Sequence, residues 1–226
     1  VSNLYRVPVL LAEQDVGQLI CKHFGMMEHS TQVAPTVVLN AKAMPKGTAE
    51  TRLGDWRVIA DRTDKCTEEV VIALVGKYVG NPDAYASVVK ALQHATMEAG
   101  LKLKLIWVDS SQLEPNAARQ DEKKSSEAWE SLKTAQGVLV PGGFGNRGIE
   151  GKMAVAGYCR ANKVPYLGIC VGLQTAVIDF ARSELGWDGA NSTEFDEATE
   201  HPVVVFLPEA SATVMGGTMR LGSRAT

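Results

Sequence analysis

The sequence predicts an α/β fold, a doubly wound and mostly parallel sheet flanked by helices. Two apolar runs, 70–75 and 137–140, lack the alternation of half-exposed strands, which is typical of strands buried on both faces of a parallel sheet. Helical patterns separate these runs from each other and from a third run at 164–167. Strands that alternate with helices predict right-handed crossovers. We therefore expect a site beyond the carboxyl ends of these strands.

The first predicted helix follows the run 70–75. Asn81 can cap its start, and Pro82 suits a first helical turn. Its apolar face is formed by Tyr85, Val88, Val89, Leu92 and Ala95. Gly100 ends the helix, and leucines alternate with lysines over 101–105, which indicates a strand nearer an edge.

The next part of the chain is polar. We expect a solvated loop over 110–126, because charged residues dominate it, and a short helix around 128–132. The strand 137–140 leads into a glycine-rich loop, and a helix is expected from about residue 149 to 161. A last strand is predicted at 202–207.

The N-terminal residues 1–67 show the least regular pattern. A short helix is expected from Val16 to Phe24, whereas 29–65 is mixed and rich in loop residues. We interpret 1–67 as a peripheral segment or interdomain connector, and 68–226 as the main domain. Nothing in the first segment indicates catalysis.

Composition excludes several classes of function. The 226 residues carry a formal net charge of -3 without a Lys/Arg block, which makes nucleic acid an unexpected partner. There is no apolar run of about 18 residues, so we expect no membrane span, and no signal-peptide pattern. The four cysteines form no C-x-x-C pair and the histidines show no metal-ligand spacing, which argues against a metal site or disulfides and favours the cytoplasm.

A turn centred on Cys170 joins the run 164–167 to a helical pattern. Gly168 and Gly172 flank the cysteine at the spacing of a nucleophile elbow, with Cys in place of Ser. The N-terminus of the following helix favours a thiolate at this position. The alternative is a buried core cysteine. The helix presents apolar residues at a 3.6-residue period: Leu173, Val177, Phe180 and Ala181.

A cysteine nucleophile that attacks an acyl group needs donors for the oxyanion. The N–H of Val171 in the elbow and the N–H of Gly143 in the glycine-rich loop 141–148 can provide them. The thiol also needs a proton acceptor, usually a histidine. His201-Pro202 is a candidate, but Val204 stands where a His-Pro-x-Glu element needs Glu. We interpret His201 as a surface or strand-entry residue, so these residues provide no convincing base.

Four segments together resemble one family. Residues 139–145, 166–174, 191–195 and 216–222 are similar to the glutaminase domain of the CTP synthase family, a class I (triad-type) glutamine amidotransferase. Residues 76–78 and 83–85 resemble the opening of that domain, and 3–8 the end of the synthetase domain that precedes it. The resemblance covers nearly the whole chain and implies a flavodoxin-like core.

The resemblance also implies a function. Cys170 would be the nucleophile that forms a glutamyl thioester, and Gly143 and Val171 would supply the oxyanion donors. Phe144, Gln174 and Glu194 would bind L-glutamine together with Gly143 and Val171. The ammonia released would aminate UTP to CTP at the chain's own synthetase domain, which binds ATP and Mg²⁺. This chain itself would need no cofactor. GTP would act as activator, and the complete enzyme would be a homo-oligomer.

Two departures from the family pattern keep alternatives open: the connection from Leu207 to Gly216 is shorter than the family usually shows, and three functional residues of the family are not in this sequence. The family's catalytic His and Glu, and an Arg that binds the glutamine carboxylate, follow the segment 216–222, and the sequence ends at Thr226. We therefore expect 68–226 to be a C-terminally incomplete domain that could be inactive alone. The alternatives are a non-catalytic docking or regulatory domain and a γ-glutamyl hydrolase.

Overall fold

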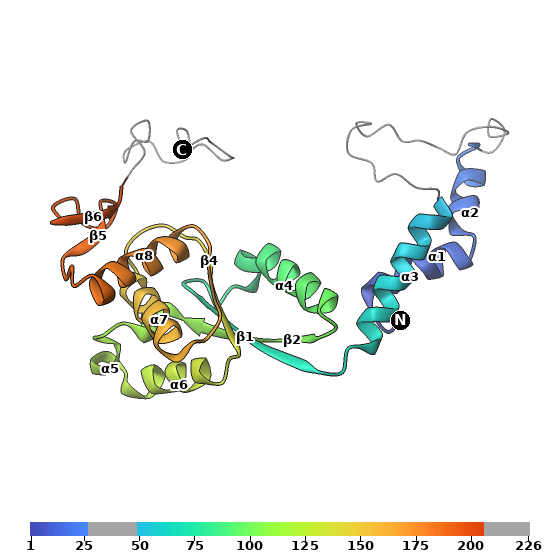
Figure 1. Cartoon of the computed structure of the whole chain (residues 1–226). Helices are drawn as coiled ribbons and strands as arrows, with labels where there is room; N and C mark the ends of the chain where they lie inside the picture. Colours follow the sequence, from blue (N-terminus) through green and yellow to red (C-terminus); the bar gives the residue numbers. More distant parts are fainter. Residues whose placement is uncertain (27–48, 206–226) are drawn as a thin grey trace. The chain divides into compact units, whose positions relative to one another are not determined.

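The computed structural model describes residues 1–26 and 49–205 (Figure 1). The predicted strand end at 205–207 and the segment 216–222 lie wholly or largely outside the described residues. The chain divides into two compact units, Val1–Glu69 with Gln93–Lys102, and Val70–Leu92 with Leu103–Thr226. The assignment of 1–67 to the end of a synthetase domain stays a prediction.

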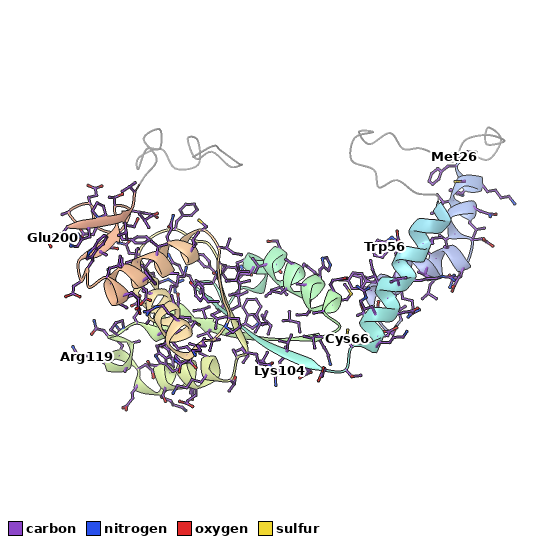
Figure 2. The ribbon with its side chains drawn as sticks, viewed as in Figure 1. Met26, Trp56, Cys66, Lys104, Arg119 and Glu200 are labelled. Carbon is purple, nitrogen blue, oxygen red and sulfur yellow. The ribbon has the colours of Figure 1, made fainter. Side chains whose placement is uncertain are left out.

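The first unit is helical. It contains η1 (Leu4–Arg6), α1 (Val7–Glu13), α2 (Val16–His23) and α3 (Ala49–Lys65). The Arg6 guanidinium bonds to the Asp61 and Asp64 carboxylates of α3, at 2.7 Å each. The Tyr5 ring stacks on Trp56, which Figure 2 labels on α3. The helix from Val16 is confirmed.

The expectation of a loop-rich stretch was wrong for 49–65, which forms the 17-residue helix α3. Among the positions of α3 whose burial is described, small Ala60 is fully buried whereas Trp56 and Val58 are exposed, so the helix gives no strong periodic signal. Hydrogen bonds attach α3 to the start of the chain: the Asn3 side chain donates to the Ala60 carbonyl at 3.0 Å and to the Asp64 carboxylate at 2.8 Å.

The second unit holds the predicted sheet. The strands are β1 (Glu69–Gly76), β2 (Lys102–Asp109), β3 (Gly137–Val140) and β4 (Tyr166–Gly168), in the order β2-β1-β3-β4. β3 runs parallel to both neighbours, with Leu139 paired to Leu74 and to Leu167. The non-sequential order and the parallel pairs confirm the doubly wound α/β fold.

Side chains of the central strands alternate between two apolar layers. Leu74 and Leu139 face α4 (Ala86–Glu98), and the apolar positions predicted for this helix, Val88, Val89 and Leu92, cover them. Val75, Val138 and Val140 face the opposite layer, to which α6 (Glu122–Lys133) and α7 (Ile149–Asn162) contribute. Figure 1 shows α4 on one side of the sheet and α6 and α7 on the other.

The start of the first predicted helix is confirmed with one difference. The Asn81 side chain accepts a hydrogen bond from the Asp83 N–H at 3.3 Å, as a cap does, but a 3-10 turn, η2 (Pro82–Tyr85), precedes α4.

The predicted solvated loop at 110–126 was wrong. This stretch folds as η3 (Ser110–Leu113), α5 (Ala117–Gln120) and the start of α6. The charged run misled the interpretation because Asp121 is the N-cap of α6, where its carboxylate accepts from the Lys124 N–H at 3.1 Å. Leu113 and Ala117 are buried beneath the polar surface.

The C-terminal part of the unit contains α8 (Val171–Glu184), β5 (Ala190–Ser192) and β6 (His201–Val204). β5 and β6 pair in parallel as a separate two-stranded sheet. α8 packs against α7, with ion pairs from Arg160 to Asp179 at 3.0 Å and from Arg182 to Glu150 at 3.1 Å. The predicted helix after the elbow and the entry of the last strand are confirmed.

The apolar period of α8 does not mark its buried face. Leu173, Val177 and Phe180 are 58%, 41% and 49% exposed, and Ala181 alone of the predicted face is buried. The side that packs inward contains Val171, Thr175 and Ile178 instead. These positions contact α7, β5 and β6 because they lie on the adjacent stripe of the helix.

Within the described residues, no helix is long and apolar enough to cross a membrane.

Gly172 is expected to tolerate no side chain. A Cβ there would lie 2.1 Å from the Val140 carbonyl oxygen, a backbone atom that cannot turn aside. We expect Gly172→Ala to lower the free energy of unfolding by about 3 kcal/mol, at the upper end for overpacking. Denaturant unfolding followed by circular dichroism measures this change. Gly80→Ala is the control, because a Cβ at Gly80 meets nothing within 4 Å; equal loss in both variants would contradict the reading.

Candidate active site

Cys170 occupies a strained turn between β4 and α8. Its backbone has φ 54° and ψ -114°, a region that non-glycine residues rarely adopt. The Ile169 N–H donates to the Val140 carbonyl at 2.9 Å, and the Gly172 N–H to the Ile169 carbonyl at 3.0 Å. A backbone strained in this way presents the thiol outward, and Cys170 is exposed rather than part of the core.

The two flanking glycines permit this turn. A Cβ on Gly168 would lie 2.5 Å from the carbonyl carbon of Gly172, so any larger residue would separate the strand from the helix. The Tyr166 hydroxyl donates to the Gly172 carbonyl at 2.7 Å, and this hydrogen bond links β4 to the start of α8. Burial raises the pKa of Tyr166 to about 12, which keeps this hydroxyl a donor.

The start of α8 provides an electrostatic setting for the sulfur. Cys170 is the N-cap of this 14-residue helix, whose N-terminus carries a partial positive charge. As the first residue of the helix, Val171 has an N–H that no carbonyl of the helix can accept. Gln174 lies one turn on, where its backbone N–H donates to the Cys170 carbonyl at 3.1 Å.

The glycine-rich loop after β3 lies against the nucleophile. A Cβ on Gly142 would be 3.2 Å from the Cys170 Cβ and 3.7 Å from its Sγ. Within the described residues, no hydrogen bond engages the N–H of Gly143. The loop therefore lies beside the elbow, and the N–H of Gly143 stays the predicted second donor for an oxyanion, together with that of Val171.

Lys77 anchors this loop from the end of β1. It is 6% exposed, and its ammonium donates to the Phe144 carbonyl and, at 2.6 Å, to the Gly145 carbonyl. Burial lowers the pKa of Lys77, the Arg147 guanidinium adds to the decrease, and Glu194 opposes it. The loops after β1, β3 and β4 thus meet at the carboxyl edge of the sheet, where the sequence predicted a site.

Two side chains hold the backbone of Lys77 in place through hydrogen bonds. The Tyr85 hydroxyl accepts from the Lys77 N–H at 3.1 Å and from the Tyr78 N–H at 3.3 Å. The Arg147 guanidinium donates to the Lys77 carbonyl at 2.7 Å and lies over the Tyr78 ring, 5.9 Å from its centroid. The loops after β1 and β3 therefore form one hydrogen-bonded unit.

The start of α7 fits tightly beneath the loop. A Cβ on Gly148 would lie 2.1 Å from the Ser110 Oγ, and one on Gly151 would lie 1.9 Å from the Ser110 carbonyl oxygen. The Gly148 N–H donates to the Glu114 carboxylate at 2.7 Å. Lys152, in the first turn of α7, is completely buried. Burial lowers the pKa of Lys152 to about 8, Lys77 adds to the decrease, and Cys170 opposes it.

Glu194 follows β5, on a loop held against the helices. The Phe195 ring packs on the apolar cluster of Ile149, Met153, Val171 and Ile178. The Glu194 N–H donates to the Ser192 Oγ at 3.2 Å. Glu194 opposes the decrease in the pKa of Lys77, which is consistent with a carboxylate near the edge that carries the elbow. Phe144, on the glycine-rich loop after β3, is 52% exposed.

Within the described residues, no contact joins a histidine to Cys170. His201 stacks on Trp187, beyond the C-terminal end of α8, with ring centroids 5.1 Å apart. It is the first residue of β6, which agrees with its interpretation as a strand-entry residue. His94 bonds to the Tyr5 hydroxyl and His23 packs on Phe24, both in the first unit. No group of three or more metal-ligating side chains occurs in the described part of the chain.

Sequence reasoning found the elbow and the loop but missed the two buried lysines. Lys77 belongs to a segment that the family resemblance had marked, without a role. Lys152 stands on a predicted helix, where a lysine is usually solvated. The glycines at 148 and 151, three residues apart, were the available signal that another segment approaches this turn closely.

Comparison with known proteins agrees with this geometry. The family model for glutamine amidotransferase class-I matches residues 81–226. A CTP synthase of Dictyostelium discoideum is 48% identical over 231 residues, covering 100% of this chain and 39% of the relative. Human CTP synthase 1 is 45% identical over 226 residues, covering 100% of this chain and 35% of the relative. The chain thus spans well under half the length of these curated relatives.

A solved structure is also similar. The Trypanosoma brucei CTPS glutaminase domain, solved with bound acivicin, aligns with a TM-score of 0.55 and 40% sequence identity. The alignment covers 63% of this chain and 52% of that one. Because the family model matches more than half of the sequence, the chain belongs to the class I glutamine amidotransferases.

Proposed function

We propose that this chain is the glutaminase portion of a CTP synthase, in which Cys170 hydrolyses L-glutamine. The observation that carries the proposal is the strained, exposed Cys170 at the start of α8 with the Gly142–Gly143 turn against it. A cysteine that has only a packing role is usually buried, so an exposed thiol on a strained backbone indicates a functional role. The similarity to CTP synthases along the whole chain supports the choice of substrate.

The proposed chemistry proceeds in two steps. The Cys170 thiolate attacks the γ-carboxamide carbon, and the carbonyl electron pair moves to oxygen, where the N–H groups of Gly143 and Val171 would stabilise it. Collapse breaks the C–N bond, and ammonia leaves with the proton taken from the thiol. Water then attacks the glutamyl thioester, which releases glutamate and returns the thiol. The family resemblance assigns the proton transfers to a histidine in a His-Pro-Glu element that follows segment 216–222.

Three further residues would hold the substrate. The Glu194 carboxylate suits the α-ammonium group of glutamine, because a charge-assisted hydrogen bond is stronger than a neutral one. Gln174, one turn into α8 from the nucleophile, can donate to and accept from the amino acid backbone. The exposed Phe144 ring would cover the apolar methylenes of the side chain.

The rest of the reaction belongs to the larger protein. The ammonia would aminate UTP that ATP has activated, with Mg²⁺, in a synthetase domain, and GTP would act as activator. We place this protein in the cytoplasm as a homo-oligomer. These partners and the location are extensions of the family resemblance to this chain.

Cys170→Ala is expected to abolish labelling by diazo-oxo-norleucine, a glutamine analogue whose methylene carbon alkylates the thiol as dinitrogen leaves. Intact-mass spectrometry should find one adduct on the unchanged chain and none on the variant. Cys66→Ala is the control, since Cys66 donates to the Arg62 carbonyl in the first unit and should leave labelling unchanged. An adduct that persists in Cys170→Ala would contradict the assignment of the nucleophile.

Glu194→Gln is expected to weaken binding of the same analogue by about tenfold, the size of one lost hydrogen bond to a charged group. The measurement is the analogue concentration that gives half the maximal labelling rate, while the maximal rate itself should change little. Glu197→Gln removes an exposed carboxylate of the same loop and serves as the matched control. An equal shift in both variants would remove Glu194 from the binding site.

A further inference from the structure

Lys152 is a fully buried lysine whose ammonium has no hydrogen-bond partner among the described residues. Lys77, the other buried lysine of the site, differs because two loop carbonyls accept from its ammonium. An ammonium removed from water is costly unless an anion or several acceptors replace the lost hydration. The position therefore needs an explanation in terms of a negative charge nearby.

The ammonium of Lys152 lies next to the candidate oxyanion loop. Its Nζ would be 3.9 Å from a Cβ built on Gly143. The negative form of the Cys170 thiol attracts this ammonium and so opposes the decrease in the pKa of Lys152. Both places where negative charge would appear during the proposed hydrolysis, the sulfur and the carbonyl oxygen held near Gly143, are thus close to one buried cation.

The carboxylates on the elements around α7 are engaged elsewhere. Asp109 accepts from the Ser111 N–H and hydroxyl, at 2.9 and 2.8 Å, and lies 4.0 Å from the Arg147 guanidinium. Glu114 accepts from the Gly148 N–H, and Glu150 pairs with Arg182. Glu194 acts on Lys77, which is the other cation facing Lys152. None of these carboxylates therefore forms an ion pair with Lys152.

We propose that Lys152 is a positioning residue for the hydrolysis, whose buried ammonium stabilises the Cys170 thiolate and the oxyanion beside Gly143. This inference rests on the proposed function. Lys152 acts through the field of its charge and touches no substrate atom. Its influence is complete only at pH values well below 8, where the ammonium is protonated, and fades as the pH rises through about 8.

The test is the pH profile of alkylation of Cys170 by iodoacetamide, followed by peptide mass between pH 5 and 9. We expect Lys152→Met, an apolar side chain of similar length, to move the midpoint upward by about one pH unit, because the thiolate loses a nearby cation. At pH 7 alkylation should slow by about fivefold or more. Lys104→Met is the matched control, since Lys104 is exposed near the start of β2 (Figure 2) and should leave the midpoint unchanged.

Thermal stability provides a second test, in which Lys152→Met is expected to stabilise the protein although it slows alkylation. Lys152 has a lowered pKa in the folded chain, so the unfolded chain binds more protons between about pH 8 and the usual lysine value. The unchanged protein therefore gains stability as the pH rises through this window. We expect Lys152→Met to have the higher Tm at pH 7, and this advantage to shrink by pH 10.

Two outcomes would overturn the proposal. A folded Lys152→Met with an unchanged alkylation midpoint would overturn it, as would a Lys152→Arg variant whose midpoint rises although the charge is kept. If Lys152→Met does not fold, the Lys152→Gln and Lys152→Arg pair applies the same test. Because alkylation needs no glutamine, a midpoint that shifts as expected while the glutamine analogue fails to label Cys170 would reject the proposed substrate and leave the role of Lys152 intact.

Discussion

The structure of the site depends on one close contact between backbones, where the start of α8 crosses the ends of β3 and β4. Gly172 meets the Val140 carbonyl, and Gly168 meets Gly172, at distances that leave no room for a Cβ on either. This crossing holds Cys170 in its strained conformation and aims the helix N-terminus at the sulfur. It also brings the loop after β3 alongside the thiol. Glycine here serves close approach, since neither residue has a positive φ.

A second constraint is electrostatic. Two lysine ammonium groups lie in the same small region, and burial lowers the pKa of both. Lys77 satisfies its ammonium with loop carbonyls and so gives the glycine-rich loop its shape. Lys152 has no such partners among the described residues. The difference between the two suggests a division of roles, in which one lysine builds the loop and the other supplies charge.

The parts that could be predicted from the sequence were those with local signals. The runs 70–75 and 137–140 are buried on both faces, so continuous apolarity marked them as strands. The elbow could be predicted because its steric demand falls on two glycines at fixed spacing. The run 110–126 could not, because Asp121 acts as a cap and the burial of Leu113 depends on contacts with α7. Lys152 was missed because its burial is a tertiary feature: its ammonium lies near Gly143 and interacts with Lys77 and Cys170, which come from other elements.

The contact between Gly172 and Val140 has a consequence for the order of events as the chain folds. The two residues are far apart in sequence, and the helix α7 lies between them. Closing a loop of this length has an entropic cost, so such contacts tend to form after local helices. The strained conformation of Cys170 cannot persist before β3 and β4 pair, because only the completed crossing over-determines it. A partly folded chain therefore carries an ordinary cysteine at this position, and the arrangement that would activate the thiol arises only when the sheet is complete.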